Sequence, residues 1–241
     1  MGLTIIIPTL NEEEALSKLL PFLNGLEKSP DEVIVVDAGG TDKSQEVAQK
    51  YGAKVIVTEK DGRAIQQHLG ALKAKEQTLC FLHADTFPNK DFIGQIEEVL
   101  ANKKVSLGGF ISIMRGERTR WWISYLNYVK TYFCPLIYSP KKYWKGLRLI
   151  FGDQVLFCRK SDYFQSGGFD LNDKVMEEAK FCLRMNELGR AKLIHRFVYS
   201  SDRRVAKWGF WKANRIYIGI AMGWAIGYST QKLAEQYEHI R

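Results

Sequence analysis

Up to about residue 100, short apolar runs alternate with segments of helical periodicity. The runs are rich in β-branched residues, which is typical of buried strands, and they cover Leu3–Ile7, Glu32–Asp37, Lys54–Val57 and Thr78–Leu82. Helices are expected from near residue 12, with Asn11 as its cap and leucines on one face, and then at about 43–51 and 63–75. Strands that alternate with helices over short connections predict a parallel α/β sheet.

The pattern becomes less regular after Val105–Ile113, another apolar run. Residues 118–144 are dense in aromatic side chains, and 149–158 predict either a strand pair or a loop that enters a strand. A helix at 176–188 and a strand at 191–198 follow. The segment from 207 to about 237 is expected to be helical and broken or loosened by glycines, and its apolar centre, 216–226, is too short to span a bilayer.

Composition narrows the class of protein. The chain has 241 residues, of which 46% are hydrophobic and 26% charged, the balance of a folded soluble protein. The four cysteines are spread out without a CxxC pair and have mostly apolar neighbours, which favours reduced, buried thiols. The N-terminus has no signal-peptide pattern. We therefore expect a cytoplasmic protein.

Positive charge is concentrated in two segments. Residues 115–148 hold eight Lys/Arg and one acid, a net charge of +7, and residues 203–215 hold five Lys/Arg and no acid. The whole chain carries +8, so the remainder is acidic, at −4. Such segments suit polyanionic partners: a nucleoside diphosphate, an anionic membrane surface or nucleic acid.

Candidate ligands follow the second and fourth predicted strands. His83-Ala84-Asp85 comes directly after a buried run, at the edge where open α/β sheets bind ligands, and alternate residues of an extended chain face the same way. Asp37 is followed by two glycines, so a ligand could approach its carboxylate closely. The GxGxxG spacing is absent, which disfavours a Rossmann dehydrogenase. A polar strand end and a tight turn are the plain alternatives.

Three charged groups lie outside those strands, and each also has a plain structural explanation. Glu177-Glu178 at the start of a helix could supply a general base, although acids at a helix N-terminus are favoured by the dipole alone. Arg203-Arg204 could clamp a diphosphate or form a surface pair, and Arg63 could contact a nucleotide or simply face solvent.

The order of the motifs is more informative than any one of them. They resemble the inverting, GT-A-fold family 2 glycosyltransferases, closest to a small bacterial subgroup with a His-Ala-Asp metal motif, some members of which are assigned to arsenosugar or carotenoid glycoside pathways. The resemblance rests on Ile-Pro-Thr-Leu-Asn-Glu (7–12), Val-Asp-Ala-Gly-Gly-Thr-Asp (36–42), Gly-Arg-Ala (62–64), Leu-His-Ala-Asp-Thr (82–86), Gly-Asp-Gln (152–154), Gly-Gly-Phe (167–169), Met-Glu-Glu (176–178) and Ser-Ser-Asp-Arg-Arg (200–204).

That resemblance implies a role for each motif. Asp37 would contact the nucleobase, Asp85 would bind Mn²⁺ or Mg²⁺, and Glu178, with Glu177, would deprotonate the acceptor hydroxyl. The nucleotide-sugar site would consist of Pro8, Thr9, Glu12, Asp37, Gly39, Arg63, His83, Ala84, Asp85, Arg203 and Arg204. The acceptor side would include Asp153, Gln154 and Gly168.

Two departures from the family pattern bear on the chemistry. His83 replaces the first Asp of the usual Asp-x-Asp, so Asp85 is the expected metal ligand and His83 a possible second one. Glu178 stands where Asp is usual. The implied organisation is a GT-A fold, an α/β, Rossmann-like, mostly parallel sheet flanked by helices, with a nucleotide-sugar-binding half at 1–104, an acceptor-side half at 105–206 and a helical extension at 207–241.

The implied reaction moves a sugar from a UDP- or GDP-linked donor to an acceptor hydroxyl on a lipid-like molecule or a small metabolite. The aromatic, basic segment 115–148 predicts contact with an anionic membrane, or else an aromatic core under a flap. One alternative function is a sugar nucleotidyltransferase, disfavoured because the loop at 8–14 is acidic. The other is a non-catalytic membrane- or nucleic-acid-binding module, although nucleic acid is not the expected partner.

Overall fold

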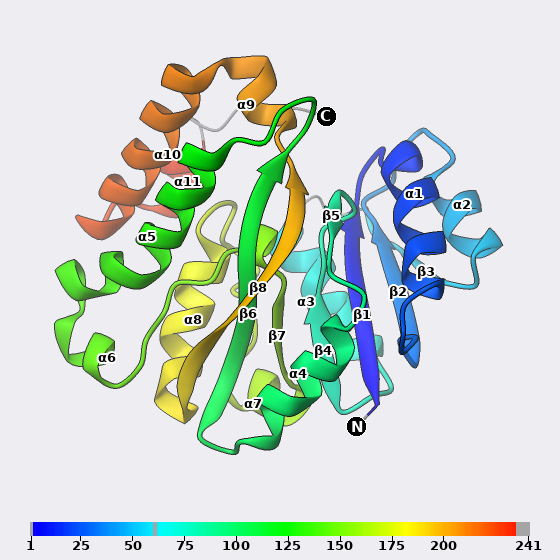
Figure 1. Ribbon diagram of the computed structural model, residues 1–241, viewed down its shortest axis with the longest axis horizontal. Helices are drawn as coiled ribbons and strands as arrows, with labels where there is room; N and C mark the ends of the chain where they lie inside the picture. Colours follow the sequence, from blue (N-terminus) through cyan, green and yellow to red (C-terminus); the bar gives the residue numbers. More distant parts are fainter. Residues whose placement is uncertain (1, 60–61, 235–241) are drawn as a thin grey trace.

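Eight strands form one central sheet in the computed structural model, which describes residues 2–59 and 62–234 (Figure 1). Their order across the sheet is β3-β2-β1-β4-β7-β6-β8-β5. The strands are β1 (Leu3–Thr9), β2 (Glu32–Asp37), β3 (Lys54–Val57), β4 (Thr78–Phe81), β5 (Thr86–Phe87), β6 (Val105–Arg115), β7 (Leu156–Arg159) and β8 (Arg190–Ser201). The first four pair in parallel, as the sequence predicts, and β6 pairs in parallel with β8.

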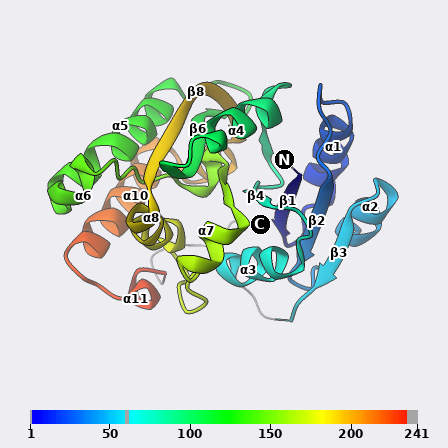
Figure 2. The same ribbon diagram turned by 90° about the horizontal axis from the view of Figure 1, so that it is seen from below.

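Helices cover both faces of this sheet. Figure 2 shows α1 and α4 on one side and α3, α7 and α8 on the other. The helices are α1 (Glu13–Asn24), α2 (Ser44–Lys50), α3 (Arg63–Lys73), α4 (Phe92–Ala101), α5 (Trp121–Tyr138), α6 (Pro140–Trp144), α7 (Lys160–Gln165), α8 (Glu177–Leu188), α9 (Arg203–Trp208), α10 (Phe210–Ala225) and α11 (Thr230–Ala234). The mixed α/β fold with C-terminal helices confirms the predicted class.

The core explains why the strands are apolar throughout rather than alternating. Ile5 and Ile7 of β1 pack into the cluster formed with α1 and α4, whereas Ile6 packs into the cluster formed with α3 and α8. Both faces of β1 are therefore buried, which is the usual state of a parallel strand between two helical layers.

Two local expectations at the end of β1 are wrong. The strand does not end at Ile7, the last residue of the predicted run: Pro8 also lies within β1, opposite Val36 in the parallel register. Asn11 does not cap α1, because its side-chain oxygen accepts a hydrogen bond from the Thr41 backbone N–H at 2.8 Å. The Glu13 N–H at the start of α1 instead donates to Asp42 at 2.8 Å. A neighbouring loop supplies the cap, a contact that sequence spacing does not reveal.

The second part of the chain resolves the alternatives that its sequence left open. The stretch 149–158 is a loop with a short 3-10 turn, η1 (Gly152–Gln154), that leads into β7. The C-terminal segment is helical and broken at glycines: its described residues form α9, α10 and α11, interrupted at Gly209 and Gly227, both at positive φ. Its expected continuation to residue 237 lies outside the described residues. Within the described part of the chain, no helix is long and apolar enough to cross a membrane.

The thiols are reduced, as the sequence indicates. Cys80, Cys158 and Cys182 are buried and free, and Cys134 is free and half-buried. Burial in apolar surroundings raises the pKa of the Cys80 thiol, so it is an unreactive core group.

Candidate active site

The site begins where β1 and β2 end. The parallel register places Thr9 opposite Asp37, so both side chains leave the sheet at the same edge. Asp37 is 1% exposed and accepts hydrogen bonds from Thr9 Oγ1 at 3.2 Å, from the Gly40 N–H at 3.1 Å and from Gln45 Nε2 at 2.8 Å. Gly39 in the turn has φ +77°, which glycine adopts without strain. Asp37 is thus held as a fixed acceptor at the strand end.

Gln66 of α3 was missed by the sequence analysis. Its Nε2 donates to the Thr9 carbonyl at 2.6 Å and to the Val36 carbonyl at 2.8 Å, while the side chain is 3% exposed. The amide therefore binds the carbonyls at the ends of two adjacent strands and ties α3 to them. A buried glutamine in an otherwise ordinary amphipathic helix gives no distinctive sequence signal.

The order in which strands are added to the sheet reverses at β1. From β1 the chain adds β2 and β3 on one side and then crosses to place β4 on the other. Such a reversal opens a crevice at the carboxyl ends of the strands. His83, Ala84 and Asp85 follow β4 at this point, beside the loop that carries Glu12 after β1.

Asp85 is joined to a segment more than a hundred residues away. The two-residue strand β5 pairs antiparallel with the end of β8, and the Ser201 N–H donates to the Asp85 carbonyl at 3.2 Å. Arg203, two residues later, donates to Asp85 Oδ2 at 2.8 Å and to both carboxylate oxygens of Glu12 at 2.9 and 3.0 Å. Glu12, Asp85 and Arg203 therefore form one charged cluster at the crevice.

Three arginines gather around His83. Burial lowers its pKa well below the ordinary histidine range, and the positive charges of Arg63, Arg204 and Arg203 lower it further. Burial also lowers the pKa of Arg204, with the neighbouring charge of Arg63 acting in the same direction. The imidazole is therefore neutral and lies among three positively charged guanidinium groups. Such a concentration of positive charge favours the binding of a polyanion.

The two glutamates lie at the start of α8. Glu177 and Glu178 are 3% and 4% exposed, and Arg63 NH1 is 3.7 Å from Oε1 of each. Burial and the adjacent charge of Glu178 raise the pKa of Glu177 to about 8, although Arg63 opposes the shift. At neutral pH the pair therefore holds a proton, a property common in catalytic carboxylate pairs.

Gly152 brings His83 and Glu178 to one point. A Cβ at this position would lie 2.3 Å from His83 Nε2 and 2.8 Å from Glu178 Oε1, so only a glycine leaves these groups in place. His83 Nε2 is buried, and it has no hydrogen-bond partner among the described residues. The loop before β7 thus joins the β4 motif to the α8 motif.

The three residues that the sequence places on the acceptor side are held in two places. Asp153 accepts a hydrogen bond from Asn127 of α5 at 2.7 Å, and Gln154 accepts one from Thr131 at 3.1 Å. These α5 contacts were also missed from sequence. Gly168 lies against the Tyr163 ring instead, and its carbonyl accepts a hydrogen bond from Arg184.

Two carboxylates in the site are candidate ligands for a divalent cation. Within the described residues, no group of three His, Cys, Asp or Glu side chains gathers at one point. Glu12 and Asp85 do converge, and their oxygens are the hard ligands that Mg²⁺ and Mn²⁺ prefer. Mg²⁺ commonly takes one or two carboxylates and completes its shell with substrate phosphates and water. The residues fit a cation that arrives with a diphosphate.

Comparisons with known proteins identify the family. The sequence model described as Glycosyl transferase family 2 matches residues 4–164. The chain is 30% identical over 179 residues to a 4,4'-diaponeurosporenoate glycosyltransferase of Staphylococcus aureus, a match that covers 69% of this chain and 46% of that protein. The chain thus matches slightly less than half the length of that curated relative.

Solved structures share the fold at low sequence identity. A complex of glucosyl-3-phosphoglycerate synthase from Mycobacterium tuberculosis with Mn²⁺, UDP and phosphoglyceric acid has a TM-score of 0.68 at 15% identity, covering 95% of this chain and 79% of that one. Residues 1–349 of TarS from S. aureus have a TM-score of 0.61 at 16% identity, covering 98% and 69%.

Proposed function

Because the chain belongs to glycosyltransferase family 2, we propose that it transfers a sugar from a nucleoside diphosphate sugar to an acceptor hydroxyl with inversion at the anomeric carbon. The observation that carries this proposal is the convergence of two groups from distant parts of the chain. Glu12, Asp85 and Arg203 form a charged cluster, and Arg63 lies between it and the glutamates of α8.

The donor is proposed to be linked to UDP or GDP and to bind along the ends of β1, β2 and β4. Asp37 would contact the base in a pocket lined by Pro8, Thr9 and Gly39, and the arginines would contact the diphosphate. Support comes from the three guanidinium groups around His83, since they match a diphosphate in charge and hydrogen-bond donors. The similarly folded mycobacterial synthase was solved with UDP.

The cation would be held by Asp85, and Glu12 is close enough to contribute. Arg203 bridges these two carboxylates and supplies the positive charge between them. When bound, the cation would offset the negative charge that develops on the departing diphosphate. Arg203 would then be released to contact the phosphates themselves. Solved structures of the mycobacterial synthase contain Mn²⁺ or Mg²⁺.

Glu178 is proposed as the general base. Glu178 lies beside Glu177 at the buried start of α8, and Arg63 NH1 is 3.7 Å from its Oε1. The acceptor oxygen would form a bond to the anomeric carbon as the bond to the β-phosphate oxygen breaks, and its proton would pass to Glu178. Attack from the face opposite the leaving group inverts the centre.

We also propose a role for each part of the chain. Residues 1–104 would bind the nucleotide, residues 105–206 would form the acceptor side through Asp153, Gln154 and Gly168, and residues 207–241 would be a C-terminal helical segment. The contacts of Asn127 and Thr131 with Asp153 and Gln154 support an acceptor side built partly from α5.

One experiment tests donor and mechanism together. The protein is incubated with Mn²⁺ and a panel of UDP- and GDP-sugars, and release of nucleoside diphosphate is followed, with water as the acceptor. We expect slow release from one donor, suppressed by EDTA, and NMR should show that the freed sugar first appears with the opposite anomeric configuration. Retention would contradict the inverting mechanism, and no release from any donor would overturn the proposal.

A further inference from the structure

Helix α5 is amphipathic in the reverse of the usual sense. Its polar side chains face inward: Ser124, Asn127 and Thr131 are 2%, 7% and 0% exposed. Its exposed face carries apolar and aromatic side chains at helical spacing, namely Trp121, Trp122, Tyr125, Phe133, Leu136 and Ile137. A surface helix of a water-soluble domain normally presents the opposite arrangement.

The inward polar face has an evident use, whereas the outward apolar face has none within the described chain. Ser124 accepts a hydrogen bond from the Met114 N–H at 2.9 Å, and Asn127 and Thr131 bind Asp153 and Gln154 beside the site. The aromatic side chains of this outward face are exposed rather than packed in a core, and Trp121 is 68% exposed. Contiguous exposed apolar surface of this kind marks an interaction site.

Two further helices extend this surface. On α10, Trp211, Ile218 and Met222 lie on one exposed face, followed by Ile226, and on α6 Trp144 is 80% exposed. Figures 1 and 2 both place α5, α6 and α10 on the side of the molecule away from β3 and α2. Ile123 of α5 and Ala213 of α10 belong to one small buried cluster, so the two helices are in contact through it.

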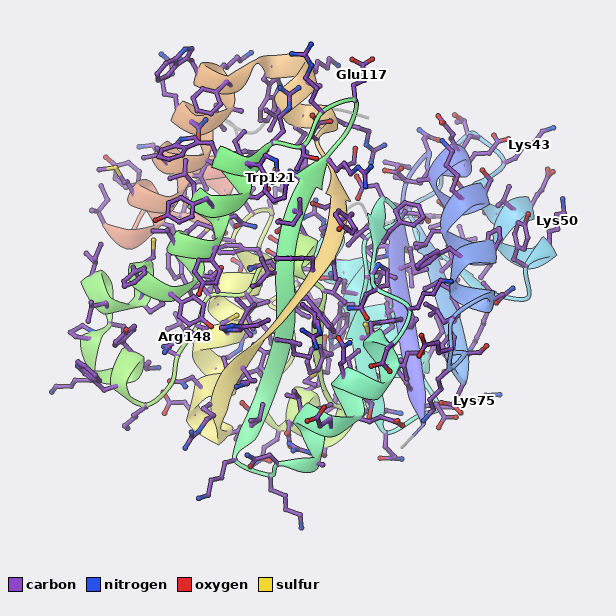
Figure 3. The ribbon with its side chains drawn as sticks, viewed as in Figure 1. Lys43, Lys50, Lys75, Glu117, Trp121 and Arg148 are labelled. Carbon is purple, nitrogen blue, oxygen red and sulfur yellow. The ribbon has the colours of Figure 1, made fainter. Side chains whose placement is uncertain are left out.

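Positive charge accompanies these apolar side chains. Exposed cations on or beside the three helices include Lys141, Lys145, Lys207 and Arg215, within the two segments of net charge +7 and +5. Figure 3 shows Arg148 on this side and Lys43 and Lys50 on the opposite one. A hollow of about 450 Å³ beside α6 is lined by Lys145, Arg148 and Arg190 together with Tyr143 and Trp144.

We propose that α5, α6 and α10 form a docking surface for an anionic lipid bilayer, with their apolar faces at the level of the headgroups. Tryptophan and tyrosine together with Lys and Arg are the side chains that suit this interface, and no described helix is suited to cross the bilayer. A second copy of the chain fits less well, because a symmetric contact would place the same positive segments against each other. The hollow beside α6 suits a lipid phosphate.

The docking surface and the site share α5. One face of this helix contacts Asp153 and Gln154, and the other would contact lipid. If the proposed transferase function holds, an acceptor hydroxyl on a lipid could reach the site without leaving the bilayer. Vesicle binding itself requires no turnover, so it can be tested whether or not the transferase proposal survives.

Co-sedimentation with vesicles tests the surface. Vesicles of phosphatidylcholine alone are compared with vesicles in which about a third of the lipid is phosphatidylglycerol, since anionic lipid attracts basic surfaces. We expect binding to the anionic vesicles, weakened by salt. The triple variant Ile137→Ser, Trp144→Ser, Trp211→Ser removes one highly exposed apolar side chain from each helix and should lower partitioning at least about tenfold.

A matched triple variant serves as the control. Val57→Ser, Leu72→Ser and Leu171→Ser change apolar side chains that are 47–54% exposed elsewhere on the molecule, and vesicle binding should be retained. Circular dichroism checks that both variants remain folded. Failure of the wild-type protein to bind anionic vesicles would overturn the proposal. So would sedimentation velocity that shows a dimer abolished by the first triple variant, because the surface would then be an interface between copies.

Discussion

The two halves of the sheet hold their buried carboxylates in different ways. At the end of β2, Asp37 accepts hydrogen bonds from Thr9, Gly40 and Gln45. At the start of α8, Glu177 and Glu178 lie side by side, and Arg63 NH1 is 3.7 Å from Oε1 of each. Burial together with the negative charge of Glu178 raises the pKa of Glu177 to about 8.

This contrast separates binding from chemistry. A carboxylate whose oxygens are fixed by several donors, as at Asp37, is a rigid hydrogen-bond acceptor. A buried carboxyl whose pKa is raised to about 8, as at Glu177, gains and loses a proton near neutral pH, as general acid–base catalysis requires. We therefore expect substitutions in the first half to affect donor binding and substitutions in the second half to affect turnover.

The largest expected effect comes from removing the proposed base. Glu178→Gln keeps the size of the side chain but cannot accept the proton, so turnover of the active donor should fall about 1,000-fold while donor affinity stays the same. Nucleoside diphosphate release and titration calorimetry measure the two quantities. Glu187→Gln, an exposed position on the same helix, is the control. Full turnover in Glu178→Gln would remove Glu178 from its assigned role.

The next effect belongs to the cluster after β4. Asp85→Asn leaves a poorer cation ligand, so Mn²⁺-dependent affinity for the nucleoside diphosphate should fall about 100-fold. The decisive readout is the difference in affinity with and without Mn²⁺, which should be large for the wild type and nearly absent for the variant. Asp91→Asn, on the surface at the start of α4, should change neither value. An unchanged Mn²⁺ dependence in Asp85→Asn would place the cation elsewhere.

The sequence predicted the strands and site residues of residues 1–104 better than those of residues 105–206, for a physical reason. The strands up to Phe81 are short apolar runs with local helices between them, so periodicity alone indicates them, and the motifs lie directly at their ends. The contact between Asp85 and Arg203 depends on β5 pairing with β8, a non-local event that no local pattern encodes. Gln66 acts through two hydrogen bonds and Asn127 through one, all to residues distant in sequence, and each resembles an ordinary helix residue.

The proton held by Glu177 makes stability depend on pH. In the unfolded chain this group releases its proton near the ordinary pKa of 4.5, whereas in the folded protein it retains it up to about pH 8. Folding therefore takes up a proton between these values, and the free energy of unfolding should decrease as pH rises through that window. Glu177→Gln should remove about 2 to 4 kcal/mol of this decrease. Urea denaturation from pH 5 to 8.5 measures it, and parallel profiles for wild type and variant would contradict the raised pKa.

Substitution of two glycines, Gly39 from the first half and Gly152 from the second, should have the smallest effects and tests the same contrast between donor binding and turnover. Gly39 has φ +77°, and among the described residues the atom nearest to a would-be Cβ is the Thr58 carbonyl oxygen at 3.9 Å. Gly39→Ala should therefore cost about 1 kcal/mol of stability through backbone strain and weaken donor binding slightly.

Gly152 has the opposite problem, because its Cβ would meet His83 Nε2 at 2.3 Å and Glu178 Oε1 at 2.8 Å. Gly152→Ala should therefore displace the proposed base and lower turnover about tenfold while donor affinity changes little. Donor affinity, turnover and urea denaturation of both variants separate the two cases. If Gly152→Ala instead weakened donor binding and kept turnover, the meeting of His83 and Glu178 would belong to binding, and the division between the halves would fail at this loop.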